Sequence, residues 1–203
     1  MDHYELEKLA KLEALSKGDF DAFLYDCDGT LADNMTAHKA AYREVAARYG
    51  VDLDVSLIDQ TAGWPTVLVA AEISKRYHVV LPESFAAEKS SIFVSKYIEQ
   101  TKPVAFVVEH LKKNVGRVKI GVVTGGSRTT VSKTLAVLGI AHLVEVMVCA
   151  GETPHGKPHP DPFLKAAHDL GVSPSSCMVF EDGNAGVQSA VAAGMKWIRV
   201  DQI

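Results

Sequence analysis

The stretch AFLYDCDGTL, residues 22–31, decides the fold. Its first four residues are apolar and stop abruptly at Asp26, which predicts a buried strand with acidic side chains at its C-terminal end. Asp26 and Asp28 lie two residues apart, and Gly29 permits a sharp turn after them. Two carboxylates this close can divide their roles, one ionised as a nucleophile or metal ligand, the other nearer protonation as an acid. The alternative for such a pair is an aspartate-rich turn or a helix cap.

Four further apolar runs predict strands, at residues 118–123, 144–149, 176–180 and 197–200. Helical patterns separate them, at residues 104–114, 129–138, 161–170 and 184–193. Strands and helices that alternate in this way predict an α/β fold, a Rossmann-like parallel sheet with helices on both faces. Such sheets bind ligands at the carboxyl ends of their strands, which is where the polar motifs of this chain occur.

The segment between the first two predicted strands is much longer than the dozen or so residues that a crossover needs. Its pattern is helical almost throughout, with helices expected at residues 35–49, 66–77 and 83–98. We expect three parts: a helical lead-in at residues 1–19, a core at residues 20–33 and 102–203, and an inserted helical cap at residues 34–101. The lead-in has leucines at three-residue steps, so it packs on the core or, alternatively, supports dimerisation.

Two loops after predicted strands carry groups that suit a phosphate. Thr124, Gly125 and Gly126 lead into a helix, where main-chain amides and a hydroxyl can hold phosphoryl oxygens. Lys157 stands among alternating prolines, which keep the backbone extended and can fix one ammonium group in place. Taken alone, the first loop is compatible with an ordinary turn and the second with a solvated lysine.

An acidic pair, Glu181 and Asp182, follows another predicted strand. Carboxylates there suit Mg²⁺, which prefers oxygen ligands, although Asp182 could instead cap the next helix. Four such motifs, all at strand ends of one alternating chain, together supply a nucleophile, an acid, a phosphate cradle, a cation and metal ligands.

Composition narrows the class of partner. The chain has 203 residues and a net charge of −4, without clustered lysine or arginine, so neither nucleic acid nor an anionic membrane is an expected partner. Its three cysteines form no C-x-x-C pair and are expected to be buried in a reducing compartment. No signal peptide and no apolar run of about 18 residues is present, so we expect a cytoplasmic monomer or weak homodimer.

From about residue 20 onward, the chain resembles the haloacid dehalogenase-like hydrolase superfamily. The resemblance rests on Asp26-x-Asp28, Thr124, Lys157 and the pair at 181–182, in that order. Within the superfamily the chain is most similar to the β-phosphoglucomutase-like branch. Residues 63–66 (GWPT), with the motifs around 157 and 181, are similar to bacterial fructose-1-phosphate and 6-phosphogluconate phosphatases.

The resemblance implies a role for each motif residue. Asp26 would attack phosphorus and form an aspartyl-phosphate, and Asp28 would protonate the leaving alkoxide and later deprotonate water. Thr124 and the loop glycines would hold phosphoryl oxygens, and Lys157 would neutralise the charge shared by Asp26 and the phosphoryl group. A carboxylic acid at Asp28 favours phosphate esters over halides, because an alkoxide needs a proton to leave.

Mg²⁺ is the cofactor that the resemblance implies. Its ligands would be Asp26, the main-chain carbonyl of Asp28 and Asp182, with Glu181 nearby.

The cap is expected to select the substrate. His38 stands where related mutases carry a histidine that orients the acid, but a surface position is equally compatible with the sequence. Trp64 could stack on a sugar or close the cap core. Related mutases grip a second phosphate with an arginine near residue 63, which is absent here; possible substitutes are Arg43, Lys75 and Arg76.

These observations favour a Mg²⁺-dependent phosphatase of small phosphorylated metabolites, above all sugar phosphates, that forms an aspartyl-phosphate intermediate. One alternative is a phosphomutase of the β-phosphoglucomutase type. Another is a non-catalytic binding protein on the same fold, against which the four retained motifs argue.

Overall fold

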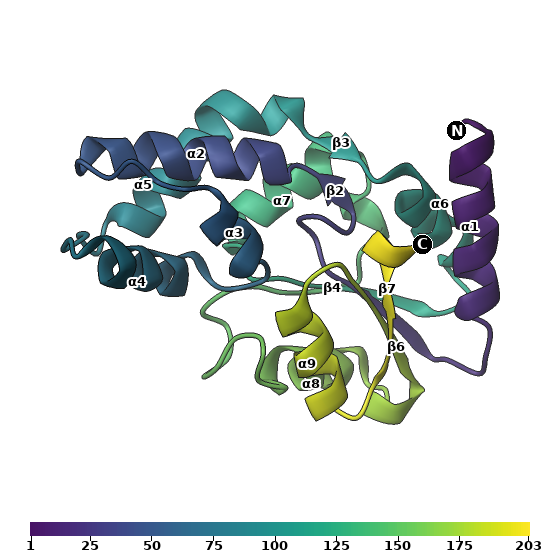
Figure 1. Cartoon of the computed structure of the whole chain (residues 1–203). Coiled ribbons are helices and arrows are strands. Elements are labelled where there is room, and N and C mark those ends of the chain that lie inside the picture. Colours follow the sequence, from purple (N-terminus) through teal and green to yellow (C-terminus); the bar gives the residue numbers. More distant parts are fainter.

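The computed structural model describes residues 1–203 and confirms the predicted α/β fold (Figure 1). A five-stranded sheet forms the core in the order β5-β4-β1-β6-β7, and every neighbouring pair is parallel. The strands are β1 (Ala22–Tyr25), β4 (Lys119–Val123), β5 (Val146–Val148), β6 (Cys177–Glu181) and β7 (Lys196–Arg199). Each coincides with a predicted apolar run to within two residues at either end.

Helices cover both faces of this sheet. On one face lie α1 (His3–Leu15), α6 (Ala105–Asn114) and α7 (Arg128–Val137). On the other lie α8 (Asp161–Leu170) and α9 (Asn184–Ala192). Phe23 and Tyr25 of β1 pack with the first group, and Ala22 and Leu24 pack with the second. Because successive side chains of a strand point to opposite faces, burial on both faces requires the continuous apolar run of β1.

Four helices form a separate layer that lies to the left of the sheet in Figure 1. They are α2 (Met35–Arg48), α3 (Ser56–Gln60), α4 (Thr66–Tyr77) and α5 (Phe85–Ile92). They enclose an apolar cluster of their own. The chain enters and leaves this layer through β2 (Ala32–Asp33) and β3 (Lys102–Pro103), which pair antiparallel. The division at residues 34 and 101 into core and movable cap stays a prediction.

The predicted helix at residues 83–98 is only partly α-helical. After α5 ends, a π-helical turn covers Phe93–Tyr97 and a 3₁₀ turn covers Ile98–Gln100. The ring of Phe93, the first residue of the π-helical turn, lies flat against the ring of His38, with ring centres 4.0 Å apart. The short helix α3 has no counterpart among the predicted helices, because five residues give too few turns for a periodic pattern.

The lead-in helix α1 packs on the core, mainly against α6, which is the first of the two expected alternatives. Glu5 Oε2 accepts a hydrogen bond from the amide of Phe106, at the start of α6, at 3.0 Å. After the end of α1, Ser16 Oγ lies 2.8 Å from His110 Nε2, and Tyr25 Oη lies 2.9 Å from His110 Nδ1. A buried imidazole thus connects α1 to the strand that precedes Asp26.

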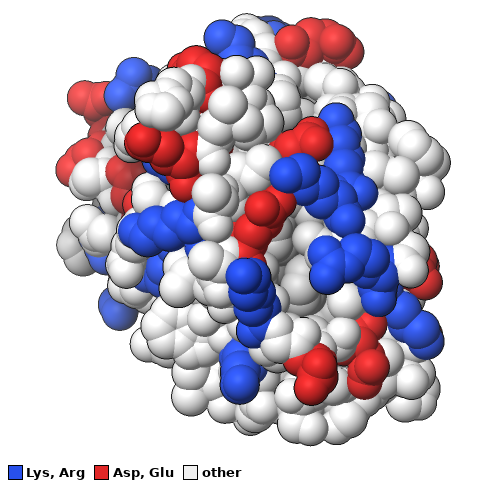
Figure 2. Space-filling view, turned by 90° about the vertical axis from the view of Figure 1, so that its right-hand side faces the viewer, with Lys and Arg blue, Asp and Glu red and all other residues white.

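The cysteines and the charged residues of one face can now be placed. The three cysteines are buried and unpaired. Lysine and arginine are interspersed with aspartate and glutamate on the face that Figure 2 shows, rather than gathered in a patch of one sign. No helix of the structure has both the length and the apolar composition needed to cross a bilayer.

Candidate active site

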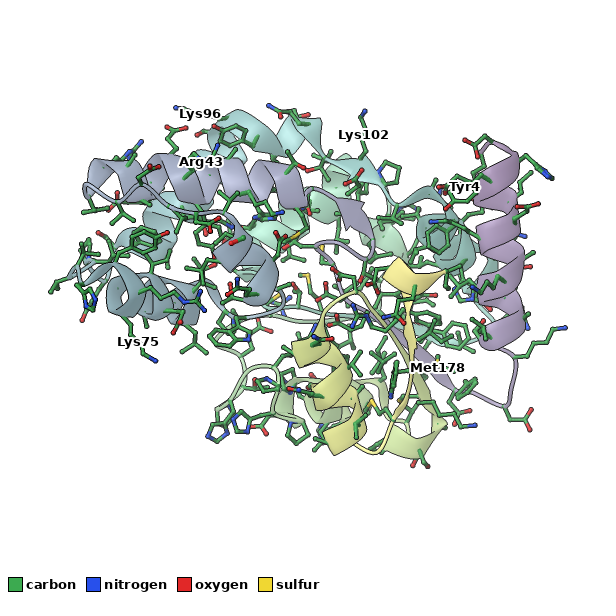
Figure 3. All side chains as sticks on the ribbon, in the orientation of Figure 1. Tyr4, Arg43, Lys75, Lys96, Lys102 and Met178 are labelled. Carbon is green, nitrogen blue, oxygen red and sulfur yellow. The ribbon has the colours of Figure 1, made fainter.

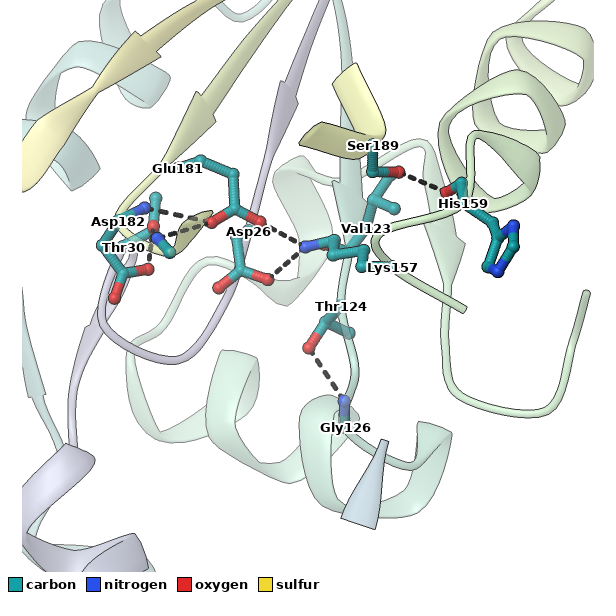
Figure 4. A network of polar contacts seen from close by, with 11 residues as sticks. Asp26, Thr30, Val123, Thr124, Gly126, Lys157, His159, Glu181, Asp182 and Ser189 are labelled. Carbon is teal, nitrogen blue, oxygen red and sulfur yellow. Dashed lines mark hydrogen bonds and ion pairs between the residues drawn. The ribbon is translucent and has the colours of Figure 1, made fainter. Parts of the chain in front are cut away.

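Polar residues that follow three neighbouring strands meet at the carboxyl edge of the sheet (Figure 4). Strand β1 pairs with β4 on one side and with β6 on the other, so the residues that follow these strands are neighbours. Asp26 follows β1, Thr124 follows β4, and Glu181 and Asp182 stand at the end of β6. The sheet therefore brings together motifs that are far apart in the sequence.

Lys157 is the cation at the centre of this group and is only 2% exposed. Its Nζ donates to Asp26 Oδ1 at 2.6 Å, to Glu181 Oε1 at 2.5 Å and to the carbonyl of Val123 at 2.8 Å. These three acceptors engage all three ammonium hydrogens. Burial lowers the pKa of Lys157, but the two carboxylates more than offset this, so its pKa lies above the ordinary value. Lys157 is therefore a fixed positive charge.

Three carboxylates surround this one ammonium group, so the cluster has an excess of negative charge. Asp26, Glu181 and Asp182 each offer an oxygen, and these oxygens lie within 4.8 Å of one another. Burial, aided by Glu181, raises the pKa of Asp182 to about 6. Burial also raises the pKa of Asp26, against the opposing charge of Lys157. A hard divalent cation would relieve this excess, and an all-oxygen donor set of this kind fits Mg²⁺.

Two glycines let the carboxylates approach so closely. Gly29 has φ +92°, and a Cβ there would lie 2.2 Å from Asp182 Oδ2. A Cβ on Gly186 in α9 would lie 1.8 Å from Glu181 Oε1. Thr30 Oγ1 adds a hydrogen bond to Asp182 Oδ1 at 2.9 Å. A side chain at either glycine would displace a carboxylate from the cluster.

Asp28 belongs to a second polar cluster, at the boundary with the inserted helices. Asn34 Nδ2 donates to Asp28 Oδ1 at 2.6 Å, and His38 Nε2 lies 3.2 Å from the same oxygen, outside good hydrogen-bond geometry. On its other side, His38 Nδ1 lies 2.6 Å from Lys89 Nζ of α5. Lys89 is 5% exposed, and its Nζ lies 4.5 Å from the ring centre of Tyr42. His38 is thus buried beside Asp28, not on the surface.

The charges fix which nitrogen of His38 carries its proton. Burial lowers the pKa of Lys89 to about 8, so at neutral pH it is mostly protonated and donates to Nδ1. Burial and Lys89 also lower the pKa of His38, so the ring is neutral and its hydrogen stands on Nε2, facing Asp28. Burial alone would raise the pKa of Asp28, but His38, Asn34 and Lys89 together hold it below the usual range.

The glycine loop after β4 lies against the inserted helices. Thr124 Oγ1 accepts from the amide of Gly126 at 3.0 Å, so the hydroxyl hydrogen stays free to donate while this amide is engaged. A Cβ on Gly125 would lie 2.6 Å from the carbonyl oxygen of Gly63 and 3.0 Å from the backbone of Trp64. Only glycine therefore lets this loop pass beneath the 63–64 segment.

A cavity of about 60 Å³ lies between the sheet edge and the inserted helices. Its lining includes Asp26, Asp28 and Thr124 from the core side, and His38 and Trp64 from the inserted layer. A groove of about 660 Å³ shares five lining residues with it. The cavity thus contains both aspartates of the first motif and has a wider approach from outside.

The lining of the cavity itself holds few cations, although Lys133 lines the adjoining groove. Lys89 is the only lysine or arginine in the cavity lining, and His38 already engages it. Arg43 and Lys75 are exposed, and Figure 3 shows Lys75 extending away from the molecule. Arg76 pairs with Glu72 on the surface of α4. None of the three cap cations considered as a replacement for the missing arginine lines the cavity.

Sequence reasoning missed three polar residues of the site. Asn34 looked like the residue before a helix, and Thr30 like part of a turn. Lys89 gave no signal at all, because a lysine within a helical pattern is normally solvated and its partner His38 is distant in the sequence. Two buried lysines in one region are unusual, but burial of a lysine cannot be read from composition.

Comparison with known proteins agrees with this architecture. The family model described as haloacid dehalogenase-like hydrolase matches residues 23–200, so α1 precedes the match. Fructose-1-phosphate phosphatase YqaB of Escherichia coli (strain K12) is 35% identical over 182 residues, which covers 89% of this chain and 96% of that protein. Hexitol phosphatase A of the same organism is 30% identical, with 88% and 82% covered. Among solved structures, β-phosphoglucomutase from Clostridium difficile superimposes with a TM-score of 0.78 at 28% identity, covering 88% of this chain and 83% of that one.

Proposed function

The chain belongs to the haloacid dehalogenase-like hydrolases, and from this premise we propose that it is a Mg²⁺-dependent phosphatase of sugar phosphates and similar small metabolites. The observation that carries the proposal is the pairing of Asp26 with a fixed ammonium, Lys157, where Asp26 and Asp28 both line one cavity. The phosphatases among its relatives, named for fructose 1-phosphate and hexitol phosphates, support the choice of substrate class.

Asp26 is the nucleophile in this proposal. One of its carboxylate oxygens forms a bond to phosphorus while the bond from phosphorus to the sugar oxygen breaks, and Asp28 gives the leaving alkoxide its proton. Water then attacks the aspartyl-phosphate, Asp28 takes a proton from that water, and the bond between Asp26 and phosphorus breaks. The products are the alcohol and inorganic phosphate, and both aspartates return to their starting states.

The surrounding residues position and balance charge. The hydroxyl of Thr124 and the amide of Gly125 bind phosphoryl oxygens, and Lys157 offsets the charge between Asp26 and the phosphoryl group. Asp26, Asp182 and the main-chain carbonyl of Asp28, with Glu181 nearby, would hold Mg²⁺, which would supply further positive charge beside the transferring group.

Asp28 must change its protonation state during this cycle. It is ionised in the free protein, because His38 and Asn34 favour its charged form. A phosphate dianion bound beside it disfavours a second negative charge and therefore raises its pKa. Substrate binding thus prepares Asp28 to act as the acid.

The cavity wall favours hydrolysis over the mutase alternative. A mutase must hold a second phosphate, and the one lysine that lines the cavity, Lys89, is already engaged by His38. The remaining cap-side lining is neutral, which suits the hydroxyls of a sugar.

Phosphate release tests the proposal. Fructose 1-phosphate, 6-phosphogluconate and β-glucose 1-phosphate are assayed with Mg²⁺ and with EDTA, in wild type and in Asp26→Asn. We expect Mg²⁺-dependent release that falls by about 10⁴-fold or more in the variant. Asp52→Asn, an exposed aspartate of the inserted layer, is the matched control and retains wild-type release. Isomerisation of β-glucose 1-phosphate in the presence of a bisphosphate, without free phosphate, would replace the proposal with the mutase.

A further inference from the structure

Two histidines stand on the loop that carries Lys157, outside the carboxylate cluster. His155 and His159 flank Lys157 in the sequence, and both are exposed. Their ring centres lie 4.8 Å apart, with the ring planes inclined by 36°. Figure 4 shows the side chain of His159 turned away from Asp26 and Glu181. The active site therefore does not use this imidazole pair.

A carboxylate fixes the orientation of the first imidazole. Asp161 Oδ2 lies 2.9 Å from His155 Nδ1 and also accepts from the main-chain amide of His155 at 3.2 Å. The Nδ1 of His155 is thereby engaged, and its Nε2 is left open on a side chain that is 62% exposed. Histidines that bind metals typically have their second ring nitrogen held by a carboxylate in this way.

The backbone of the second imidazole is restrained, but its ring is exposed. His159 stands between Pro158 and Pro160, each of which fixes its own φ and restricts the residue before it. Its carbonyl accepts a hydrogen bond from Ser189 Oγ of α9 at 2.5 Å. The chain therefore fixes the position of His159 and leaves the ring available to a ligand.

The spacing of the rings matches joint ligation of one ion. With Zn–N bonds of about 2.0–2.1 Å, two imidazoles at right or tetrahedral angles have ring centres roughly 4.5–5.2 Å apart. The observed 4.8 Å lies within this interval. We propose that His155 and His159 bind one transition-metal ion of the Zn²⁺ or Ni²⁺ type, that Asp161 orients His155, and that water completes the coordination.

This site differs in chemistry from the carboxylate cluster. Imidazole suits Zn²⁺ and Ni²⁺, whereas Mg²⁺ prefers oxygen ligands, so the two sites select different ions. An ion held by residues 155 and 159 also connects the two ends of the segment that carries Lys157. Binding should therefore stabilise the folded protein, because the unfolded chain does not hold the two rings together.

The test is calorimetric titration of untagged full-length protein with Ni²⁺ and with Zn²⁺ in saturating Mg²⁺, with the melting temperature measured in parallel. Wild type should bind one ion and melt at a higher temperature with it, and His155→Ala/His159→Ala should lose both effects. Asp161→Asn should bind roughly 10-fold more weakly. The matched control is His168→Ala, since His168 also lies beside a carboxylate, Asp169, at 3.1 Å; it should bind like wild type.

Three outcomes would overturn the proposal. The first is absence of binding by wild type, and the second is equal binding by wild type and the double alanine variant. The third is binding that survives the double variant but disappears in Asp182→Asn, which would assign the ion to the carboxylate cluster. Because the readouts are affinity and melting temperature, they do not depend on whether the protein is a phosphatase.

Discussion

The two buried lysines near Asp26 and Asp28 are held in opposite ways. Lys157 donates to two carboxylates and a carbonyl, all from strands of the sheet or residues that directly follow them, and its pKa is raised. Lys89 comes from the inserted helix α5, contacts the imidazole of His38 and the ring of Tyr42, and has its pKa lowered to about 8. One lysine is permanently charged, and the other can lose its proton near physiological pH.

The difference follows from where their partners come from. The partners of Lys157 belong to one sheet, so we expect that cluster to keep its geometry if the inserted helices move. The side-chain contacts from Lys89 to His38 and from His38 to Asp28 connect the inserted layer to the core. We therefore expect them to be complete only when the two layers are in contact, which links the acid to closure of the site.

The largest effect is expected from Lys157→Met, which removes the ammonium group from the carboxylate cluster. Removing the ammonium leaves Asp26 and Glu181 facing each other without compensation, so we expect kcat to fall by about 10²–10³-fold. The free energy of unfolding should fall by about 3–5 kcal/mol, as measured by urea denaturation. Lys165→Met, which removes an exposed pair with Asp169, is the control and should change neither quantity appreciably. Wild-type turnover in Lys157→Met would contradict the central place of this ammonium.

Lys89→Met disrupts the second polar cluster, in which Lys89 contacts His38 and His38 approaches Asp28. Losing the donor to Nδ1 frees His38 to change its tautomer and tilt away from Asp28, so we expect kcat to fall by up to about 10²-fold with little change in Mg²⁺ affinity. Wild-type activity should also decline above about pH 8, as Lys89 loses its proton, and the variant should lack this decline.

The control for this variant is Lys96→Met, an exposed lysine on the same segment that pairs with Glu44. It should keep both the wild-type rate and the wild-type pH profile. If Lys89→Met lowers the rate but keeps the decline at high pH, the titrating group is not Lys89.

Substitution of a third buried polar group, His110, should change the pH dependence of stability without changing the rate. It therefore differs from the two lysines, whose substitution should change the rate. Burial lowers the pKa of His110 to about 4, whereas an unfolded histidine titrates near 6.5. Between these values the unfolded chain binds more protons, so stability present above pH 6.5 is lost as the pH falls to 4. The loss should reach about 3 kcal/mol.

The measurement is urea denaturation at several pH values in wild type and His110→Gln, with exposed His142→Gln as the control. The His110 variant should show a smaller loss of stability across this interval, and the control should follow wild type. Parallel pH curves for wild type and His110→Gln would contradict the assignment.

The sequence predicts the sheet of the core better than the contacts between the core and the inserted helices, for a physical reason. Strands buried on both faces must be continuous apolar runs. The sequence alone therefore predicts β1 and the acidic residue Asp26 that follows it. Lys157 could be offered as a candidate cation from its position after a strand, but only the family resemblance assigned it a role, because nothing in its own loop shows that it is buried. Lys89 could not be placed at all, since its contact with His38 depends on how α2 and α5 pack. The π-helical turn after α5 could not be predicted from the sequence either, because a helical pattern does not show where a turn contains an extra residue.

The antiparallel ribbon of β2 and β3 has a consequence for the timing of the chemistry. Both connections between the layers run through this one ribbon, and we predict that the inserted helices rotate about this strip of backbone. Asn34 and His38 follow β2 directly, and both approach Asp28. Such a rotation would separate Asn34 and His38 from Asp28 and so change its proton affinity, and the predicted acid would then be inactive while the site is open.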